Sequence, residues 1–295
     1  MYIKVSEIHN IYIEDLGNPK WIPILFVHWW PWAGFNEMDK KFFNFEKNRV
    51  IFFDQRWTWK SLPFGELIDN NTFELVSDIE KIRKFLGIDK WIIFWGSWWT
   101  TLSLIYAINF PDRIISMILR WVFLWTQKEL NWFVSKDWAA NFYPESFDIL
   151  NDFFENKIGK EIIKDYVDKL EWIDAKKYAK IWNDYEFSLA RLEWYKKNNS
   201  ENDINLALAK IETYYFINNL FIEEDYILNN ISKIKNINIS IIQWRYDILC
   251  PPLYAWKLHK ELKNSTIKFI LAWHSPYEEN IFEELKNEVE KISFS

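Results

Sequence analysis

Short apolar runs alternate with amphipathic helical patterns at both ends of the chain, and this alternation constrains the fold more than any other feature. The runs at 22–27, 49–54, 91–94 and 114–120 are nearly continuous in apolar residues, which is typical of strands buried on both faces of a parallel sheet. Strands that alternate with helices form such sheets through right-handed crossovers. The sequence therefore predicts an α/β fold.

Helix signals separate these runs. Residues 71–87 have apolar side chains at helical spacing, Asn71 or Thr72 as the cap and Gly87 as the C-terminal stop. Residues 96–110 predict a second helix that ends before Pro111. The same alternation returns near the C-terminus, where we expect strands at 238–243 and 266–271 and helices at 253–262 and after Pro276.

The alternation stops between residues 125 and 235. This segment is rich in Lys, Asp, Glu, Asn and aromatic residues, and its patterns, such as "INLALAKIETYYFI", are helical. We interpret 125–235 as a helical cap inserted into a core domain made of residues 1–124 and 236–295.

Composition excludes several classes of function. The 295 residues are 49% hydrophobic, enough for a sizeable core. A net charge of -6 argues against a nucleic-acid partner. The sequence has neither an uncharged apolar stretch of about 18 residues nor an N-terminal signal pattern, so we expect a cytoplasmic protein without a membrane partner. Cys250 is the single cysteine, which excludes an internal disulfide. The residues do not indicate an oligomeric state.

Ser97 lies in "WIIFWGSWWTTLSLIYA", between an expected strand and an expected helix. The serine of α/β hydrolases occupies this turn in the pattern G-x-S-x-G; here both outer glycine positions hold Trp. Asp247 and His274 each follow a later strand, in the chain order Ser, Asp, His that this fold uses. We expect His274 to take the serine proton and Asp247 to orient the histidine.

An oxyanion hole needs two backbone N–H groups. One comes from the residue after the nucleophile, here Trp98, and the other from a loop after an early strand. The stretch "HWWPWAG" stands in that loop position. We therefore expect the second donor to be the N–H of Trp29.

The motifs together resemble the proline iminopeptidase family of α/β-hydrolase serine peptidases. The family pattern HGGPG-G, DQRG-G-S, GGSWG, RG-F, GRYD--CPP and AGHS corresponds to the following stretches of this chain: "HWWPWAG", "FFDQRWTWKS", "FWGSWWT", "LRWVFLW", "QWRYDILCPP" and "LAWHSPYE". The resemblance covers almost the full length.

This resemblance implies an α/β-hydrolase fold with a mostly parallel, eight-stranded type of sheet, flanking helices and a helical cap. It also implies release of an N-terminal proline from small peptides through an acyl-enzyme, without a cofactor or metal. Glu186 in "IWNDYEFS" and Glu212 in "AKIETYYF" match the family glutamates that bind the substrate amine, although Tyr185 replaces a family Trp. Cys250 matches a family thiol near the active site.

The departures from the family pattern are of one kind: Trp often stands where the family has glycine. The chain has 20 Trp and only 6 Gly. The positions concerned are Trp21, Trp29, Trp30, Trp32, Trp57, Trp59, Trp95, Trp99, Trp121, Trp244 and Trp273, with Trp125 and Trp138 as weaker cases. Glycine at the first eleven would raise its content from roughly 2% to about 6%, near the usual 7%. We hypothesise a gene that uses TGA for glycine and was translated with a table that reads TGA as Trp.

Two alternatives to a proline iminopeptidase remain open. One is another serine α/β hydrolase, such as a broader aminopeptidase, an amidase or an esterase. The other is an inactive α/β-hydrolase-fold binding protein, if the tryptophans are real. Epoxide hydrolases and dehalogenases are disfavoured, because they carry Asp at the position of Ser97.

Overall fold

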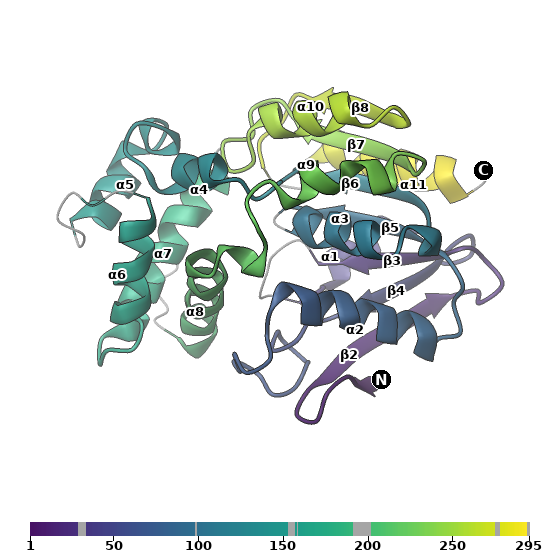
Figure 1. Ribbon diagram of the computed structural model, residues 1–295, viewed down its shortest axis with the longest axis horizontal. Coiled ribbons are helices and arrows are strands. Elements are labelled where there is room, and N and C mark those ends of the chain that lie inside the picture. The colour runs from purple at the N-terminus through teal and green to yellow at the C-terminus, as the bar shows by residue number, and fades with distance from the viewer. Residues whose placement is uncertain are drawn as a thin grey trace.

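The protein is built on one eight-stranded sheet with helices on both faces (Figure 1). The computed structural model describes residues 1–28, 34–97, 99–152, 157, 159–190, 202–274 and 278–293. The strand order is β1-β2-β4-β3-β5-β6-β7-β8. The strands are β1 (Tyr2–Lys4), β2 (Asn10–Gly17), β3 (Pro23–Val27), β4 (Arg49–Phe53), β5 (Trp91–Gly96), β6 (Ile114–Arg120), β7 (Asn238–Trp244) and β8 (Ser265–Ile270).

The strands β3 to β8 are parallel, as the alternation of strands and helices predicted. The register pairs Phe26 of β3 with Phe52 of β4 and Phe94 of β5, and all three rings are fully buried. The central strands β3, β4 and β5 carry buried apolar side chains on both faces because both faces are covered by helices. The α/β-hydrolase fold expected from the sequence is confirmed.

The two N-terminal strands were not predicted. Both β1 and β2 pair antiparallel with their neighbours. In β2 the residues Ile11 and Ile13 are buried, while Asn10, Tyr12 and Glu14 on either side of them are partly exposed. This period-2 pattern is the signal of a half-buried strand, and it was available in the sequence.

Helices cover the sheet as the crossover topology requires. In Figure 1, α2 (Thr72–Phe85), α3 (Trp99–Asn109) and α9 (Tyr226–Asn230) lie across one face, and α1 (Glu37–Lys40) and α11 (Glu279–Ser293) across the other. The helix α10 (Pro252–Glu261) packs against β7 and β8. The carboxamide of Asn71 caps α2 by accepting from the N–H groups of Phe73 and Glu74 at 3.1 Å, so Asn71 is the cap.

The helices α4 to α8 stand beside the sheet layers (Figure 1). They are α4 (Gln127–Val134), α5 (Pro144–Asn151), α6 (Lys160–Lys169), α7 (Ala175–Ala190) and α8 (Asp203–Ile217). Thr126 and Glu129 form a capping box at the start of α4. Within 125–235, α9 differs from these helices because it packs against α3 of the sheet layers.

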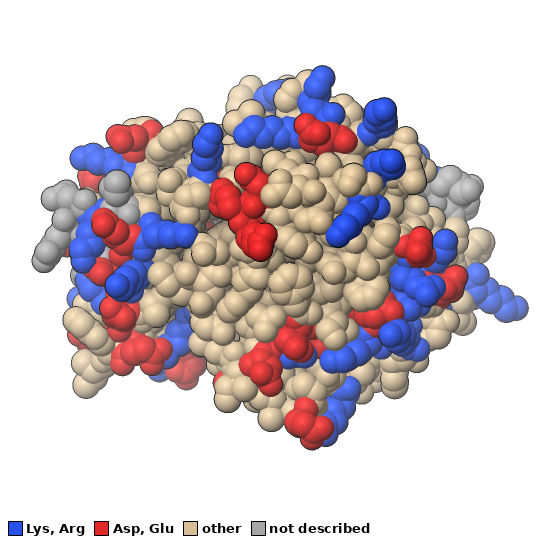
Figure 2. All heavy atoms as spheres, viewed as in Figure 1, with Lys and Arg blue, Asp and Glu red and all other residues tan. Residues whose placement is uncertain are grey.

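The surface carries both signs of charge. On the face shown in Figure 2, basic and acidic side chains of the described residues are interspersed, and an uncharged area lies between them. Within the described ranges, no helix combines the length and apolar character needed to cross a membrane.

Candidate active site

Three strands of the sheet deliver the predicted catalytic side chains to one place. Ser97 follows β5, Asp247 follows β7, and His274 follows β8. The carboxyl ends of parallel strands lie at the same edge of a sheet, where ligands of α/β proteins bind. The strand order therefore explains why residues up to 177 positions apart meet.

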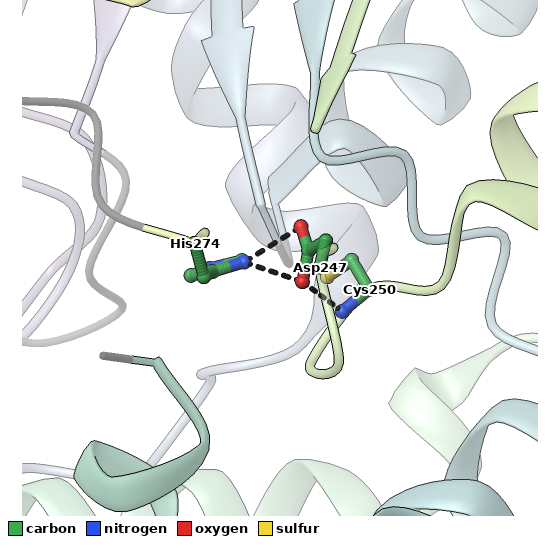
Figure 3. A group of neighbouring side chains, drawn as sticks. All are labelled: Asp247, Cys250 and His274. Atoms are coloured by element: carbon green, nitrogen blue, oxygen red, sulfur yellow. Dashed lines mark hydrogen bonds and ion pairs between the residues drawn. The ribbon is translucent and has the colours of Figure 1, made fainter. Parts of the chain in front are cut away.

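The side chains form a continuous hydrogen-bonded line. The Oγ of Ser97 lies 3.4 Å from Nε2 of His274, and Nδ1 of His274 lies 2.8 and 2.9 Å from the two carboxylate oxygens of Asp247 (Figure 3). All three residues are buried. With the ring proton on Nδ1, His274 donates to Asp247 and its Nε2 accepts from Ser97, which is the tautomer a general base needs.

Ser97 occupies a sharp turn between β5 and α3. Its φ is +61°, in the left-handed region that residues other than glycine rarely adopt. The N–H of Ser97 donates to Arg120 O at 3.1 Å, and Ser97 O accepts from the N–H and hydroxyl of Thr100 at 2.8 Å. These bonds hold the strained backbone, as in the nucleophile elbow of α/β hydrolases.

The loop that carries Asp247 is fixed by three hydrogen bonds. The N–H of Cys250 donates to Oδ1 of Asp247 at 2.8 Å. Nε2 of Gln243 donates to Cys250 O at 2.9 Å, and the indole N–H of Trp132 on α4 donates to Ile248 O at 2.6 Å. Burial and the charge of Asp247 raise the pKa of the Cys250 thiol well above its usual value, so Cys250 is a poor nucleophile.

Asp247, Cys250 and His274 are also a donor set that suits a metal ion, with ligand atoms within 4.8 Å of one another. Tetrahedral zinc with bonds of about 2.0 Å to N and O keeps those atoms about 3.3 Å apart. Asp247 and His274 are closer, at 2.8 Å. Their spacing is that of a hydrogen bond, and we assign no metal here.

The two predicted oxyanion donors, Trp29 and Trp98, lie outside the described residues. The end of the "HWWPWAG" loop is described, and Asp54 holds it. The carboxylate of Asp54 accepts from the N–H groups of Phe35 at 3.1 Å and Lys60 at 3.2 Å. A Cβ on Gly34, whose φ is +66°, would lie 2.5 Å from this carboxylate. Burial raises the pKa of Asp54 to about 6.

The helices α7 and α8 bring Glu186 and Glu212 together. Both side chains are buried, and the indole N–H of Trp182 donates to Oε2 of Glu212 at 2.6 Å. Burial raises the pKa of Glu212 to about 7. Burial and the neighbouring charge of Glu212 raise the pKa of Glu186 well above its usual value. Two carboxylates this close share a proton unless a cation separates them.

Trp182, whose indole N–H donates to Glu212, belongs to a buried aromatic cluster. The rings of Phe133, Trp182 and Phe216 pack edge to face, with centroids 5.6 to 6.3 Å apart. All three are buried. Buried rings exclude water from this region, and the loss of hydration raises the pKa values of the two carboxyl groups.

Asp54, Arg56 and Gln243 lie within the sequence motifs, but the motifs predicted no role for them. Arg56 is fully buried between Asp78 and Glu74 of α2. The oxygen of the Gln243 side chain accepts from the N–H of Val122 at 3.1 Å, so Gln243 ties the strand end of β6 to the Asp247 loop. Each of them lies within three residues of a strand end, which is the signal that could have indicated these roles.

Several tryptophans have backbone conformations that suit glycine. Trp57, Trp59, Trp121 and Trp125 have φ values of +74°, +41°, +53° and +57°. The first three stand at positions where the family has glycine, and Trp125 is the weaker case. Among the described residues, the tryptophans that fit the family pattern, Trp91, Trp132, Trp182 and Trp256, have no positive φ.

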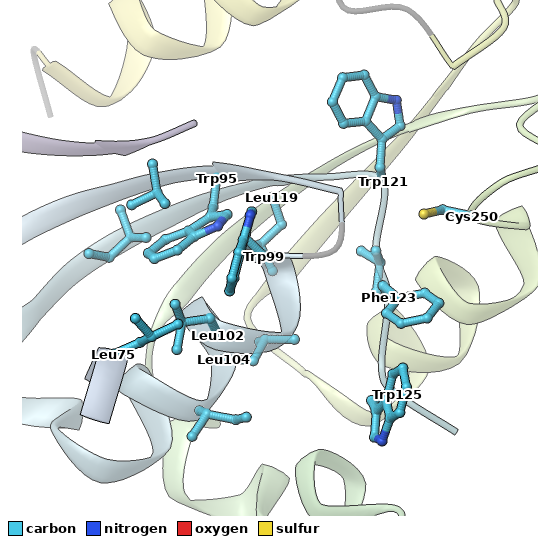
Figure 4. Close-up of a cluster of buried hydrophobic side chains, with 14 of the residues drawn as sticks. Leu75, Trp95, Trp99, Leu102, Leu104, Leu119, Trp121, Phe123, Trp125 and Cys250 are labelled. Atoms are coloured by element: carbon cyan, nitrogen blue, oxygen red, sulfur yellow. The ribbon is translucent and has the colours of Figure 1, made fainter. Parts of the chain in front are cut away.

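Indoles at positions where the family has glycine also crowd the site. The Trp121 ring stacks on the ring of His274 with centroids 4.5 Å apart, and Trp95 and Trp99 pack beside the nucleophile turn (Figure 4). Trp95 is fully buried, and within the described part of the chain its indole N–H has no hydrogen-bond partner. An unpaired buried donor costs about 1–3 kcal/mol.

Known proteins of one kind resemble this chain over nearly its whole length. A proline iminopeptidase of Arabidopsis thaliana is 38% identical over 299 residues, which cover 98% of this chain and 78% of that protein. A proline iminopeptidase of Neisseria meningitidis serogroup A is 37% identical, covering 99% of this chain and 95% of that protein. No protein-family model matches the chain.

Solved structures agree on the fold. A proline iminopeptidase structure from Mycobacterium smegmatis superposes with a TM-score of 0.68 at 12% identity, covering 100% of this chain and 98% of that one. An esterase from Exiguobacterium antarcticum superposes with a TM-score of 0.63 at 17% identity, covering 99% of this chain and 98% of that one. On the identity and coverage of its sequence relatives, the chain belongs to the proline iminopeptidase family.

Proposed function

We propose that this protein hydrolyses the bond after an N-terminal proline in small peptides, with Ser97 as nucleophile, His274 as general base and acid, and Asp247 as the residue that orients the histidine. The observation that carries this proposal is the hydrogen-bonded line from Ser97 Oγ through His274 to Asp247. It supports a serine hydrolase, and the membership of the family supports proline as the residue released.

The reaction proceeds through an acyl-enzyme. Ser97 Oγ attacks the prolyl carbonyl carbon while Nε2 of His274 takes the hydroxyl proton. The backbone N–H groups of residues 29 and 98 stabilise the oxyanion. His274 then passes its proton to the departing peptide amine, and the C–N bond breaks. Water, deprotonated by His274, attacks the ester and releases proline from Ser97.

Glu186 and Glu212 bind the free amine of the substrate. A protonated prolyl nitrogen carries two N–H bonds, and two carboxylates can accept both. Its positive charge also replaces the proton that the pair otherwise shares. When the proline nitrogen is acylated, by a blocking group or by a preceding residue, it carries no positive charge for the pair to bind, which makes the enzyme an aminopeptidase. We place this amine site in a helical cap formed by residues 125–235.

A comparison of anilides tests the assignment. We expect cleavage of proline anilide, much slower cleavage of alanine anilide and none of N-acetylproline anilide. Ser97→Ala should abolish turnover, and Glu212→Ala should weaken it selectively for substrates with a free amine. Equal rates for proline and alanine anilides would identify a broader aminopeptidase, and cleavage of acyl esters alone would identify an esterase.

We also propose that glycine replaces tryptophan in the natural polypeptide at Trp21, Trp29, Trp30, Trp32, Trp57, Trp59, Trp95, Trp99, Trp121, Trp244 and Trp273, because the gene uses TGA for glycine. Positive φ at Trp57, Trp59 and Trp121 supports this, since left-handed backbone is cheap only for glycine. The positive φ at Trp125 adds that position to the set.

The codons in the gene show whether these positions encode glycine or tryptophan. We expect TGA at Trp57, Trp95 and Trp121, and TGG at Trp132 and Trp182, which serve as internal controls. Mass spectrometry of the protein from its own host should find glycine at the TGA positions. TGG codons at Trp95 and Trp121 would overturn the proposal and leave real tryptophans in a degenerate, inactive hydrolase.

A further inference from the structure

We propose that Asn70 and Tyr215 form a clamp that sets the position of α8, and with it Glu212, relative to Ser97. Tyr215 is then a positioning residue for recognition of the substrate's free amine. This inference rests on the proposed function, because it assigns a task within the amine site of that same enzyme.

The clamp is a buried hydrogen bond between the sheet layers and the helices beside them. The hydroxyl of Tyr215 on α8 donates to Oδ1 of Asn70 at 2.8 Å, across 145 residues of sequence. Tyr215 is fully buried and Asn70 is 1% exposed. A buried bond of this kind is directional, and losing one partner leaves the other without compensation from water.

The core side of the clamp is rigid. Arg56, which follows β4, places its guanidinium against both carboxylate oxygens of Asp78 and 2.8 Å from Glu74 on α2. The same guanidinium donates to the carbonyl of Asp69, directly before Asn70. Asn70 is therefore held by an arginine that α2 holds in turn.

A second bond fixes the end of α8. The hydroxyl of Thr72 donates to the carbonyl of Leu220, in the short turn Asn219–Phe221 that follows the helix. Thr72 lies two residues after Asn70 and begins α2. One anchored segment, 70–72, thus holds both Tyr215 within α8 and the turn after it.

Tyr215 connects this anchor to the chemistry. It lies three residues after Glu212, on the same side of α8. An aminopeptidase must keep its amine-binding carboxylates at a fixed distance from the nucleophile, so that a single residue fits between them. The clamp supplies that distance.

The test is Tyr215→Phe in the glycine form of the protein, assayed with proline anilide and with an acyl ester that lacks an amine. We expect kcat/KM for proline anilide to fall about ten-fold, mainly through KM, since a small misplacement of a binding group has effects of this size. Ester hydrolysis should change less than about two-fold. Tyr214→Phe removes the same hydroxyl from a neighbouring half-buried residue and is the matched control.

A double variant separates positioning from folding. Asn70→Leu with Tyr215→Phe removes both polar partners, so thermal stability should recover relative to Tyr215→Phe alone. The selectivity for amine-bearing substrates should stay low because the directional bond is still missing. Recovery of selectivity together with stability overturns the clamp, as does an equal loss of anilide and ester hydrolysis in Tyr215→Phe.

The two proposals fail in different ways. A parent protein that prefers alanine anilide overturns the assignment of proline. The effect of Tyr215→Phe is then measured with alanine anilide in place of proline anilide. A parent that cleaves esters alone overturns both.

Discussion

Ser97, Asp247 and His274 come from the ends of three strands, whereas Glu186 and Glu212 come from two packed helices. Each triad residue is satisfied by its neighbours, because Ser97, His274 and Asp247 exchange hydrogen bonds in a line. The two glutamates would repel each other if both were ionised, and burial raises the pKa of both. The hydrogen bonds of the triad are thus formed without substrate, while the carboxylate pair needs a cation to balance its charge. The following variants test this difference.

The largest effect is expected from Ser97→Ala. Removing the nucleophile should lower kcat by about 10⁶-fold, the size seen when a triad serine is lost. Thermal stability should be nearly unchanged, because alanine keeps the same unfavourable φ of +61° that Ser97 holds. Steady-state kinetics and thermal unfolding measure the two.

Ser103→Ala is the control, since Ser103 is another buried serine of the same region, and its hydroxyl donates to Thr100 O. Activity that survives Ser97→Ala would mean that the line of three residues is not the catalytic centre.

Glu212→Ala should act on binding more than on chemistry. Truncating one member of a buried charge site costs about 2–5 kcal/mol of binding, so kcat/KM for proline anilide should fall about 30- to 5,000-fold. Hydrolysis of an acyl ester without an amine should persist. The exposed Glu161 of α6 supplies the control Glu161→Ala. A parallel loss on both substrates would show that Glu212 maintains structure instead of reading the amine.

Stability should fall as the pH rises through neutrality. The pKa of Glu212 is about 7 in the folded protein, above its ordinary value of 4.5. Between these values the folded state holds a proton that the unfolded state has lost. The favourable contribution is therefore complete below pH 4.5 and lost as the pH rises through 7, by up to about 3 kcal/mol.

Denaturant unfolding between pH 5 and 8 measures this loss. Burial also raises the pKa of Glu129 to about 7 and that of Asp54 to about 6, so these groups contribute to the same pH dependence. The contribution of Glu212 is therefore the difference in pH-dependent unfolding free energy between the parent and Glu212→Gln. Equal pH slopes in the two proteins would show that Glu212 does not titrate in this range.

Trp182→Phe should give the smallest change. The indole N–H lowers the pKa of Glu212 by donating to its carboxylate. Its loss should raise that pKa by about one unit. Because the amine binds to the deprotonated pair, the acidic limb of kcat/KM should move to higher pH for proline anilide and stay in place for an ester. A limb that moves for both substrates would assign it to the triad.

The two regions also differ in how far the sequence predicted them. Each triad residue follows an apolar strand, so its neighbourhood could be inferred from the strands and the parallel topology. The glutamates lie on helices that contain other acidic residues, and only resemblance to the family distinguished Glu186 and Glu212. Their shared burial beside Trp182 depends on how α7 packs on α8, which helical periodicity does not specify.

Sequence by itself determined the strand and helix alternation, the order Ser97, Asp247, His274 and the unusual placement of tryptophan. These follow from local patterns, because burial on a parallel sheet and the chemistry of a tight turn restrict residue types position by position. Tertiary structure decided the distances within the triad, the protonation of the carboxylate pair and the bond from Tyr215 to Asn70. Those depend on long-range packing and on the exclusion of water, which no local pattern encodes.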